Sequence, residues 1–249
     1  EIRAERSADA ARFGQADTVV MLWPALMWPA GHRITAHLRV AGRVEVSTSF
    51  VVRSRANALG NLDSLVAAVR ADDHPVRNIA TGPSLLGGSQ LVSGEVATTD
   101  FRSDDGTIGS GTDVPHRRTW VRFVMTMPEK PMSAAGAPVA IYGHGITAFK
   151  ETLAFDAGPN AARGVATIGI DIPNHGERMN DGGSVLDLTI TPKLGRLVAM
   201  PLQGSLDQLS LLLAVRDHLG AAVPGLDTSR ILYEGTSMGG FLGMQFLSF

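Results

Sequence analysis

The residues best suited to chemistry lie near the end of the chain, where a serine stands between glycines. A Gly-x-Ser-x-Gly motif runs from Gly235 to Gly239 with Ser237 at its centre, after the strand-like run 231–234 and before an apolar helical pattern. A sharp strand-to-helix turn holds such a serine clear of the sheet, and the glycines permit the tight backbone. The helix begins at Met238 and presents free N–H groups where negative charge would develop. We therefore predict Ser237 as a nucleophile and the Met238 N–H as an oxyanion donor.

The residues on either side of the motif make it a stronger indication of a nucleophilic serine. The chain has 28 glycines, so a bare Gly-x-Ser-x-Gly could arise by chance. A strand before it and a helix after it are the context that the chemistry requires. The alternative is a glycine-rich helix start that packs closely against a sheet and has no catalytic role.

A second group of candidates follows a strand predicted at 138–142. The residues after this strand are Gly143, His144, Gly145 and Ile146. Acyl transfer to a serine needs a second backbone N–H donor, which the loop after an early strand supplies. We expect Ile146 to be this donor, with Gly145 as the next candidate. His144 is expected to shape the turn rather than to carry a proton.

The elements that would position these residues divide the chain near residue 88. A β-rich N-terminal region is expected for 1–88 and an α/β domain for 89–249. The pattern predicts strands at 18–23, 33–40, 44–52, 91–98, 119–127, 138–142, 165–171 and 230–234, and helices at 62–70 and 205–219. The last three strands alternate with helices, which is typical of a parallel sheet. Ser205 and Gln208 resemble a capping box that would begin the second helix.

Three segments, each at a strand end, resemble the α/β-hydrolase superfamily and its serine esterases and lipases. They are the HG turn at Gly143, the segment DIPNHGER from Asp171 and the segment GTSMGG from Gly235. The β-rich N-terminal region and SGEVATTDFRSDDGT resemble bacterial secreted lipases. The resemblance implies a mostly parallel sheet flanked by helices, preceded by a small β-rich unit. It also implies cleavage of a small-molecule or lipid carboxylic ester through an acyl-enzyme on Ser237, with no metal or organic cofactor, and it favours a secreted or periplasmic location.

The order of catalytic residues in that family sets a further expectation. An acid and then a histidine follow the serine along the chain. Only 12 residues follow Ser237 (249 − 237), and none is acidic or histidine, while all seven histidines lie upstream. We therefore expect a C-terminally truncated domain whose acid and histidine lie downstream of Phe249. The apolar residues Phe246 and Leu247 in the final segment would then be covered by the continuation.

Two other functions fit parts of the sequence. Residues 143–148 also match Gly-x-Gly-x-x-Ala after a strand, and Asp171 ends the next strand as a ribose-binding acid would, so a Rossmann-type nucleotide-binding oxidoreductase is one alternative. A hydrolase-like scaffold that serves as a binding module is the other.

Two loops also have alternative interpretations. The acidic loop 100–118 is expected to be a solvated turn rather than a calcium site, because its acidic residues do not follow the EF-hand order. The segment 177–204 is either a lid or an ordinary insertion.

Composition narrows the possible partners. With 22 basic and 24 acidic residues and a net charge of −2, the chain has no basic field for nucleic acid. No run of about 18 apolar residues is present, so we expect no transmembrane segment. The absence of cysteine excludes disulfides and thiolate metal sites. Oligomeric state is left open.

Overall fold

A computed structural model describes residues 2–6, 20–24, 31–40, 43–52, 60–83, 90–111, 113–179 and 194–249. The chain forms two compact units, Glu1–Gly60 and Asn61–Phe249. This division lies earlier than the predicted boundary at residue 88. The difference arises because α2 (Leu62–Ala71) packs on the larger unit and β5 (Val76–Pro83) pairs with its sheet.

The described residues of the smaller unit form two pairs of β-strands. β1 (Ile2–Arg6) pairs antiparallel with β2 (Val20–Pro24), and β3 (Arg33–Val40) pairs antiparallel with β4 (Arg43–Val51). The prediction of a small β-rich unit ahead of the α/β domain is confirmed.

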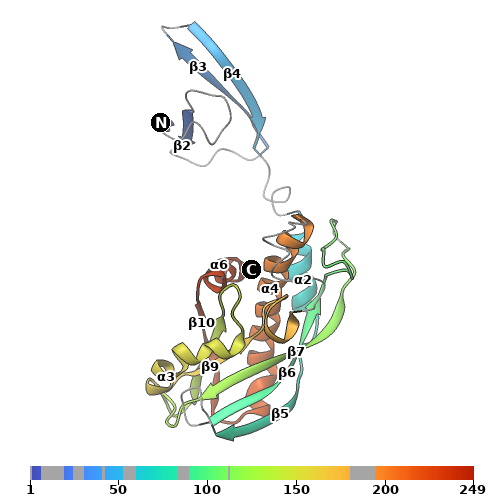
Figure 1. The fold of residues 1–249 in the computed structure, drawn as a ribbon, viewed down its shortest axis with the longest axis vertical. Helices are drawn as coiled ribbons and strands as arrows, with labels where there is room; N and C mark the ends of the chain where they lie inside the picture. The colour runs from blue at the N-terminus through green and yellow to red at the C-terminus, as the bar shows by residue number, and fades with distance from the viewer. Residues whose placement is uncertain are drawn as a thin grey trace. The chain divides into compact units, whose positions relative to one another are not determined.

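The larger unit is built on a mixed sheet of six strands (Figure 1). Their order is β10–β8–β9–β7–β6–β5, with β6 at Gln90–Asp100, β7 at Arg117–Met127, β8 at Ala137–Gly143, β9 at Ala166–Ile170 and β10 at Leu226–Gly235. β8 pairs in parallel with β9 and with β10, which confirms the three strands predicted to be parallel. β7 runs antiparallel to β9 and β6, and β6 runs antiparallel to β5. The three parallel strands are joined through helical crossovers, as parallel pairing requires.

Helices cover both faces of this sheet, as predicted. They are η2 (Lys150–Leu153), α3 (Ala154–Ala162), η3 (Gly176–Arg178), α4 (Leu194–Ala214), the π-helical turn η5 (Val215–Leu219), α5 (Gly220–Ala222) and α6 (Met238–Phe246). Phe123 of β7 packs in the cluster that contains Leu211 of α4. Its neighbour Val124 packs with Leu153 and Ala157 on the other face, because successive strand residues point to opposite sides.

The long helix α4 corrects one prediction. It begins at Leu194, so Ser205 lies inside the helix and is not an N-cap. The Ser205 hydroxyl instead donates to the Pro201 carbonyl and to Gln245 on α6. The helical stretch 195–222 is long and apolar enough to cross a membrane, but 78% of its most apolar window is buried inside the protein. That degree of burial is typical of a core helix.

Part of the segment predicted as a lid, 177–204, can be placed. Residues 177–179 lie in and just after η3, and residues 194–204 lie in α4. Residues 180–193 lie outside the described part of the chain. Phe246, which was expected to need a covering segment, is already buried in a cluster with Leu65 and Leu209, whereas Leu247 is exposed.

Candidate active site

Ser237 lies at a strained turn between β10 and α6. Its backbone has φ 53° and ψ −113°, a conformation that is unfavourable for a residue with a side chain. The residue is exposed, while the turn beneath it is tightly packed. Such strain persists only where the surrounding structure fixes the backbone, and it is common at functional sites.

The two glycines of the motif make this packing possible. A Cβ added to Gly239 would lie 1.9 Å from the Gly143 carbonyl oxygen, and one added to Gly235 would lie 2.5 Å from the Gly239 carbonyl carbon. The Thr236 N–H also donates to the Gly143 oxygen over 3.0 Å. The turn at Ser237 is therefore fixed directly onto the end of β8.

The loop after β8, residues 144–149 and hereafter the β8 loop, lies beside Ser237. A Cβ added to Gly145 would lie 3.5 Å from the Ser237 Cβ. The Ala148 N–H donates to the Gly145 carbonyl over 3.2 Å, and Thr147 has φ 63°. A positive φ at the third residue only, with this hydrogen bond, is the pattern of a type II turn in which Ile146 is the second residue. The sequence placed these two segments far apart, and the fold brings them together.

Two backbone N–H groups beside Ser237 remain available to a ligand. Within the described part of the chain, neither Ile146 nor Met238 donates its N–H to another protein group. Ile146 is 46% exposed, and Met238 is the first residue of α6. Free N–H groups at a turn and at a helix N-terminus are suited to bind an oxygen that gains negative charge.

His144 is occupied by structural hydrogen bonds. Its ring is fully buried; Nδ1–H donates to the Gly145 carbonyl over 2.8 Å, and Nε2 accepts from the Ile172 N–H over 3.0 Å. Burial lowers the pKa of His144 to about 4, so the ring is neutral at pH 7. Its 4.0 Å approach to Asp171 is therefore not an ion pair, because the facing nitrogen is already an acceptor. Neither ring nitrogen is free to exchange a proton with a substrate.

Four other histidines of the larger unit bond groups other than Ser237. The buried His175 donates its Nδ1–H to the Pro173 carbonyl, while its Nε2 has no hydrogen-bond partner among the described residues. His74 bonds two backbone carbonyls, His116 bonds the Val114 carbonyl and His218 contacts Asp73. No histidine in the described part of the chain hydrogen-bonds the Ser237 hydroxyl. The site thus contains a serine and two candidate oxyanion donors, and among these residues no histidine is hydrogen-bonded to the serine hydroxyl.

The buried histidines predict a loss of stability in mild acid. The folded-state pKa of His144 lies near 4, against its ordinary 6.5, so the unfolded chain binds more protons between these values. The contribution of His144 to the free energy of unfolding should be fully present above pH 6.5 and should decrease as the pH falls toward 4. From pH 7.5 to 5 we expect His144 to account for a loss of about 2 kcal/mol in the free energy of unfolding.

Urea unfolding at the two pH values measures this loss. His218→Gln, which changes a partly exposed histidine, should retain it, whereas His144→Asn should lose most of it. Equal pH dependence in the parent and in His144→Asn would show that His144 is not the cause.

No pattern in the sequence indicates a role for Lys150, and Asp171 enters only as a possible ribose ligand and as the first residue of the DIPNHGER segment. In the structure Asp171 is buried at the end of β9 and accepts hydrogen bonds from the Lys150 N–H, the Lys150 Nζ and the Glu177 N–H. Burial alone would lower the Lys150 pKa, but the hydrogen bonds and charges of Asp171 and Glu151 together outweigh it and raise that pKa. Asp171 is therefore not free to bind a ribose. The sequence feature that could have indicated this role is a charged residue directly after a buried strand.

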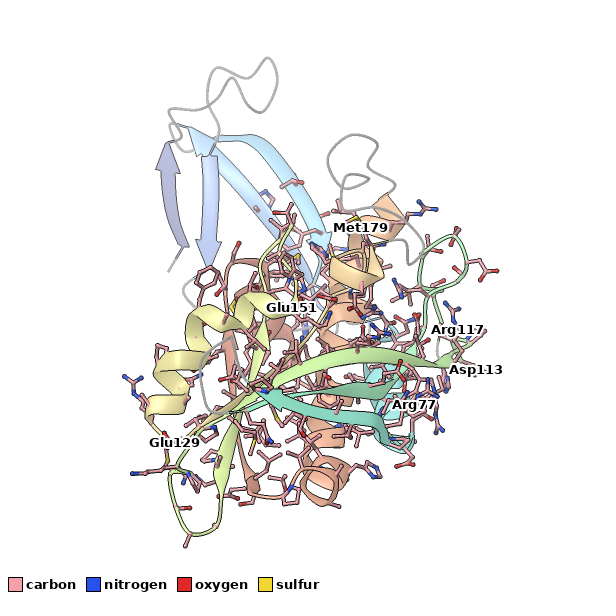
Figure 2. The ribbon with its side chains drawn as sticks, turned by 60° about the horizontal axis from the view of Figure 1, so that its bottom comes forward. Arg77, Asp113, Arg117, Glu129, Glu151 and Met179 are labelled. Atoms are coloured by element: carbon pink, nitrogen blue, oxygen red, sulfur yellow. The ribbon has the colours of Figure 1, made fainter. Side chains whose placement is uncertain are left out.

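The remaining candidates from the sequence lie elsewhere. In the loop 100–118, Asp105 accepts hydrogen bonds from Ser103 and Thr107, which lower its pKa to about 2. Among the described residues, no group of three His, Cys, Asp or Glu is arranged to hold a metal. A cleft of about 370 Å³ lies over β5, β6 and β7 and is lined by residues that include Arg122, Lys150 and Glu151, the last labelled in Figure 2. Ser237 is not part of its lining.

Comparisons with known proteins give similar solved structures at low sequence identity. No family model matches the chain, and no curated protein does. Among solved structures, the acetyl xylan esterase from Paenibacillus sp. R4 shows 19% identity and a TM-score of 0.40 over 74% of this chain and 53% of its own. A cold-adapted esterase from an Arctic intertidal metagenomic library shows 20% identity and a TM-score of 0.41 over 67% of this chain and 57% of its own.

Acetyl xylan esterase 1 from Thermoanaerobacterium sp. JW/SL YS485 shows 17% identity and a TM-score of 0.41 over 75% of this chain and 53% of its own. The chain spans about half the length of these structures. The identification of the fold rests on the chain's own strands and turns. The mixed sheet flanked by helices, with the β8 loop and a strained strand-to-helix turn side by side at the ends of its parallel strands, has the α/β-hydrolase fold.

Proposed function

We propose that this protein is a serine hydrolase that cleaves carboxylic esters through an acyl-enzyme on Ser237. The observation that carries the proposal is the strained, exposed serine flanked by two N–H groups that lack protein partners. Strain at an exposed residue is retained when its conformation is needed. Small-molecule and lipid esters are the substrate class, and the reaction needs no metal or organic cofactor.

In the proposed reaction the Ser237 Oγ attacks the ester carbonyl carbon, and its proton passes to a base. The carbonyl oxygen becomes an oxyanion that accepts hydrogen bonds from the Ile146 and Met238 N–H groups, with Gly145 as the alternative donor. The alcohol leaves with a proton from the base. Water then gives a proton to the base and attacks the acyl carbon, and the carboxylic acid is released as the Ser237 oxygen regains its proton from the base.

The base and its orienting acid are proposed to lie downstream of Phe249. A serine hydroxyl is a weak nucleophile at neutral pH unless a neighbouring base accepts its proton. The nitrogens of His144 are both hydrogen-bonded inside the protein, and the pKa of His175 is lowered by burial.

Covalent labelling tests this function directly. The 249-residue chain and an extended protein, which continues with the sequence encoded after Phe249, are treated with a fluorophosphonate, and the labelled residue is mapped by mass spectrometry. We expect rapid labelling of Ser237 in the extended protein, together with turnover of a short-chain ester, and slow labelling in the shorter chain. Labelling elsewhere would refute the proposal. Saturable binding of a nicotinamide nucleotide without labelling would favour the oxidoreductase alternative.

The oxyanion donor can be tested by removing one N–H group. Ile146 is the second residue of a type II turn, a position that proline favours, so Ile146→Pro should delete the donor and keep the turn. In the extended protein we expect kcat to fall by about 10²- to 10³-fold. Ile146→Ala keeps the N–H and should change kcat by no more than a few fold. A folded Ile146→Pro variant with the parent kcat would assign the oxyanion to other donors.

A further inference from the structure

We propose that Asp171 is a positioning residue that holds the β8 loop in the conformation required for oxyanion binding. The inference rests on the proposed function of Ser237 and goes beyond it, because Asp171 neither contacts the reacting atoms nor belongs to the predicted set of catalytic residues. Its side chain connects the end of β9 to the residue that follows the β8 loop.

The first attachment is at the C-terminal end of the loop. One carboxylate oxygen of Asp171 accepts the Lys150 N–H over 2.7 Å, and the other accepts the Lys150 ammonium over 3.0 Å. The second oxygen also accepts the Glu177 N–H over 3.0 Å. A single side chain therefore joins Lys150, the residue directly after the β8 loop, to the segment after β9.

The second attachment is at the N-terminal end of the same loop. The His144 ring accepts the Ile172 N–H and donates to the Gly145 carbonyl, so it links the residue after Asp171 to the start of the turn. Both ends of the β8 loop are thus held by consecutive residues, 171 and 172.

The packing around Asp171 shows that its position is tightly specified. The side chain is buried, and Gly176, with φ 52°, approaches so closely that an added Cβ would lie 2.3 Å from the Asp171 Oδ1. Lys150 is also buried, and its ammonium lies 3.1 Å from Glu151 and 3.3 Å from Glu177. Buried charges held by several hydrogen bonds fix the geometry of the groups that they join.

The strained turn explains why such attachment is needed. Thr147 is β-branched and has φ 63°, a conformation that costs free energy and relaxes unless its surroundings prevent it. Relaxation would move the Ile146 N–H, which directly precedes the turn's strained residue. Loss of the Asp171 hydrogen bonds should therefore affect oxyanion stabilisation more than substrate binding.

The test compares two substitutions of Asp171 in the extended protein. Asp171→Ala removes both acceptors, and we expect kcat to fall by about 100-fold while KM changes by less than about two-fold. Asp171→Asn is isosteric and keeps one acceptor for the Lys150 N–H. Its kcat should therefore fall by only about 10-fold. Affinity for a trifluoromethyl ketone, which mimics the oxyanion when it adds to Ser237, should fall in parallel with kcat.

Asp100→Asn is the matched control, since Asp100 is another buried carboxylate with a cationic partner, in this case Arg102, and lies outside the β8 loop and the residues that hold it. It should lower thermal stability to a similar extent and leave kcat and ketone affinity unchanged. Equal losses of kcat in the Asp100 and Asp171 variants would overturn the proposal, and so would a folded Asp171→Asn with the parent kcat and ketone affinity.

Hydrogen exchange separates this proposal from that of the catalytic function. In Asp171→Ala, or in Asp171→Asn if the alanine variant does not fold, amides of residues 145–150 should exchange faster than in the parent, whether or not the protein hydrolyses esters. Faster exchange with no ester turnover in the parent would sink the proposed function and leave the role of Asp171 in the loop. Unchanged exchange would refute that role.

Discussion

Ser237→Ala in the extended protein is expected to lower kcat for a short-chain ester by about 10⁴- to 10⁶-fold. The oxygen that forms the acyl-enzyme is removed, so only binding and oxyanion stabilisation remain to accelerate hydrolysis. Steady-state turnover and fluorophosphonate labelling both report this loss. Ser248→Ala changes an exposed serine beyond α6 and should retain the parent rate. Parent-like turnover in folded Ser237→Ala would eliminate the serine mechanism.

At position 237, the serine that the reaction needs is expected to lower the free energy of unfolding. Glycine adopts a φ of 53° without the steric cost that serine bears there. Ser237→Gly is therefore expected to be inactive and to gain about 1 kcal/mol in the free energy of unfolding. Urea unfolding compares it with Ser237→Ala, which should be close to the parent because alanine bears the same strain.

Gly239→Ala should have the largest effect on stability. The added methyl group would lie 1.9 Å from the Gly143 carbonyl oxygen, and neither partner is a flexible side chain. The turn would have to move away from β8, which also breaks the Thr236 hydrogen bond to Gly143. We expect a loss of at least about 3 kcal/mol in the free energy of unfolding, measured by urea denaturation, and loss of ester turnover.

Gly240→Ala is the matched control one residue along. A Cβ added to Gly240 would lie 3.3 Å from the nearest atom, the Gly235 carbonyl oxygen. Gly240 also lies within α6, where alanine is favoured over glycine by about 1 kcal/mol. This variant should stay within about 1 kcal/mol of the parent and retain turnover. If Gly239→Ala were as stable as Gly240→Ala, the close packing of the turn on β8 would be wrong.

The sequence predicted the larger unit's core strands because their signals are local. Three short apolar runs alternate with helical patterns, and the glycine motif follows the last run directly. It did not predict that β5 joins the sheet, because this depends on pairing with β6 and not on the composition of residues 76–83. Nor did it predict the start of α4. Tertiary packing buries Ser205 and Gln208 inside the helix, and this outweighs their capping pattern.

By itself, the sequence determined which residues can do chemistry at the end of β10 and after β8, since the glycines and the serine that a tight turn needs are neighbours in the chain. Only the tertiary structure decided what those residues meet. The β8 loop contacts the turn at Ser237 across some 90 positions of sequence, and Asp171 holds that loop through hydrogen bonds to Lys150, 21 residues away. The structure also engaged both His144 nitrogens, because a buried ring must satisfy its hydrogen bonds within the protein.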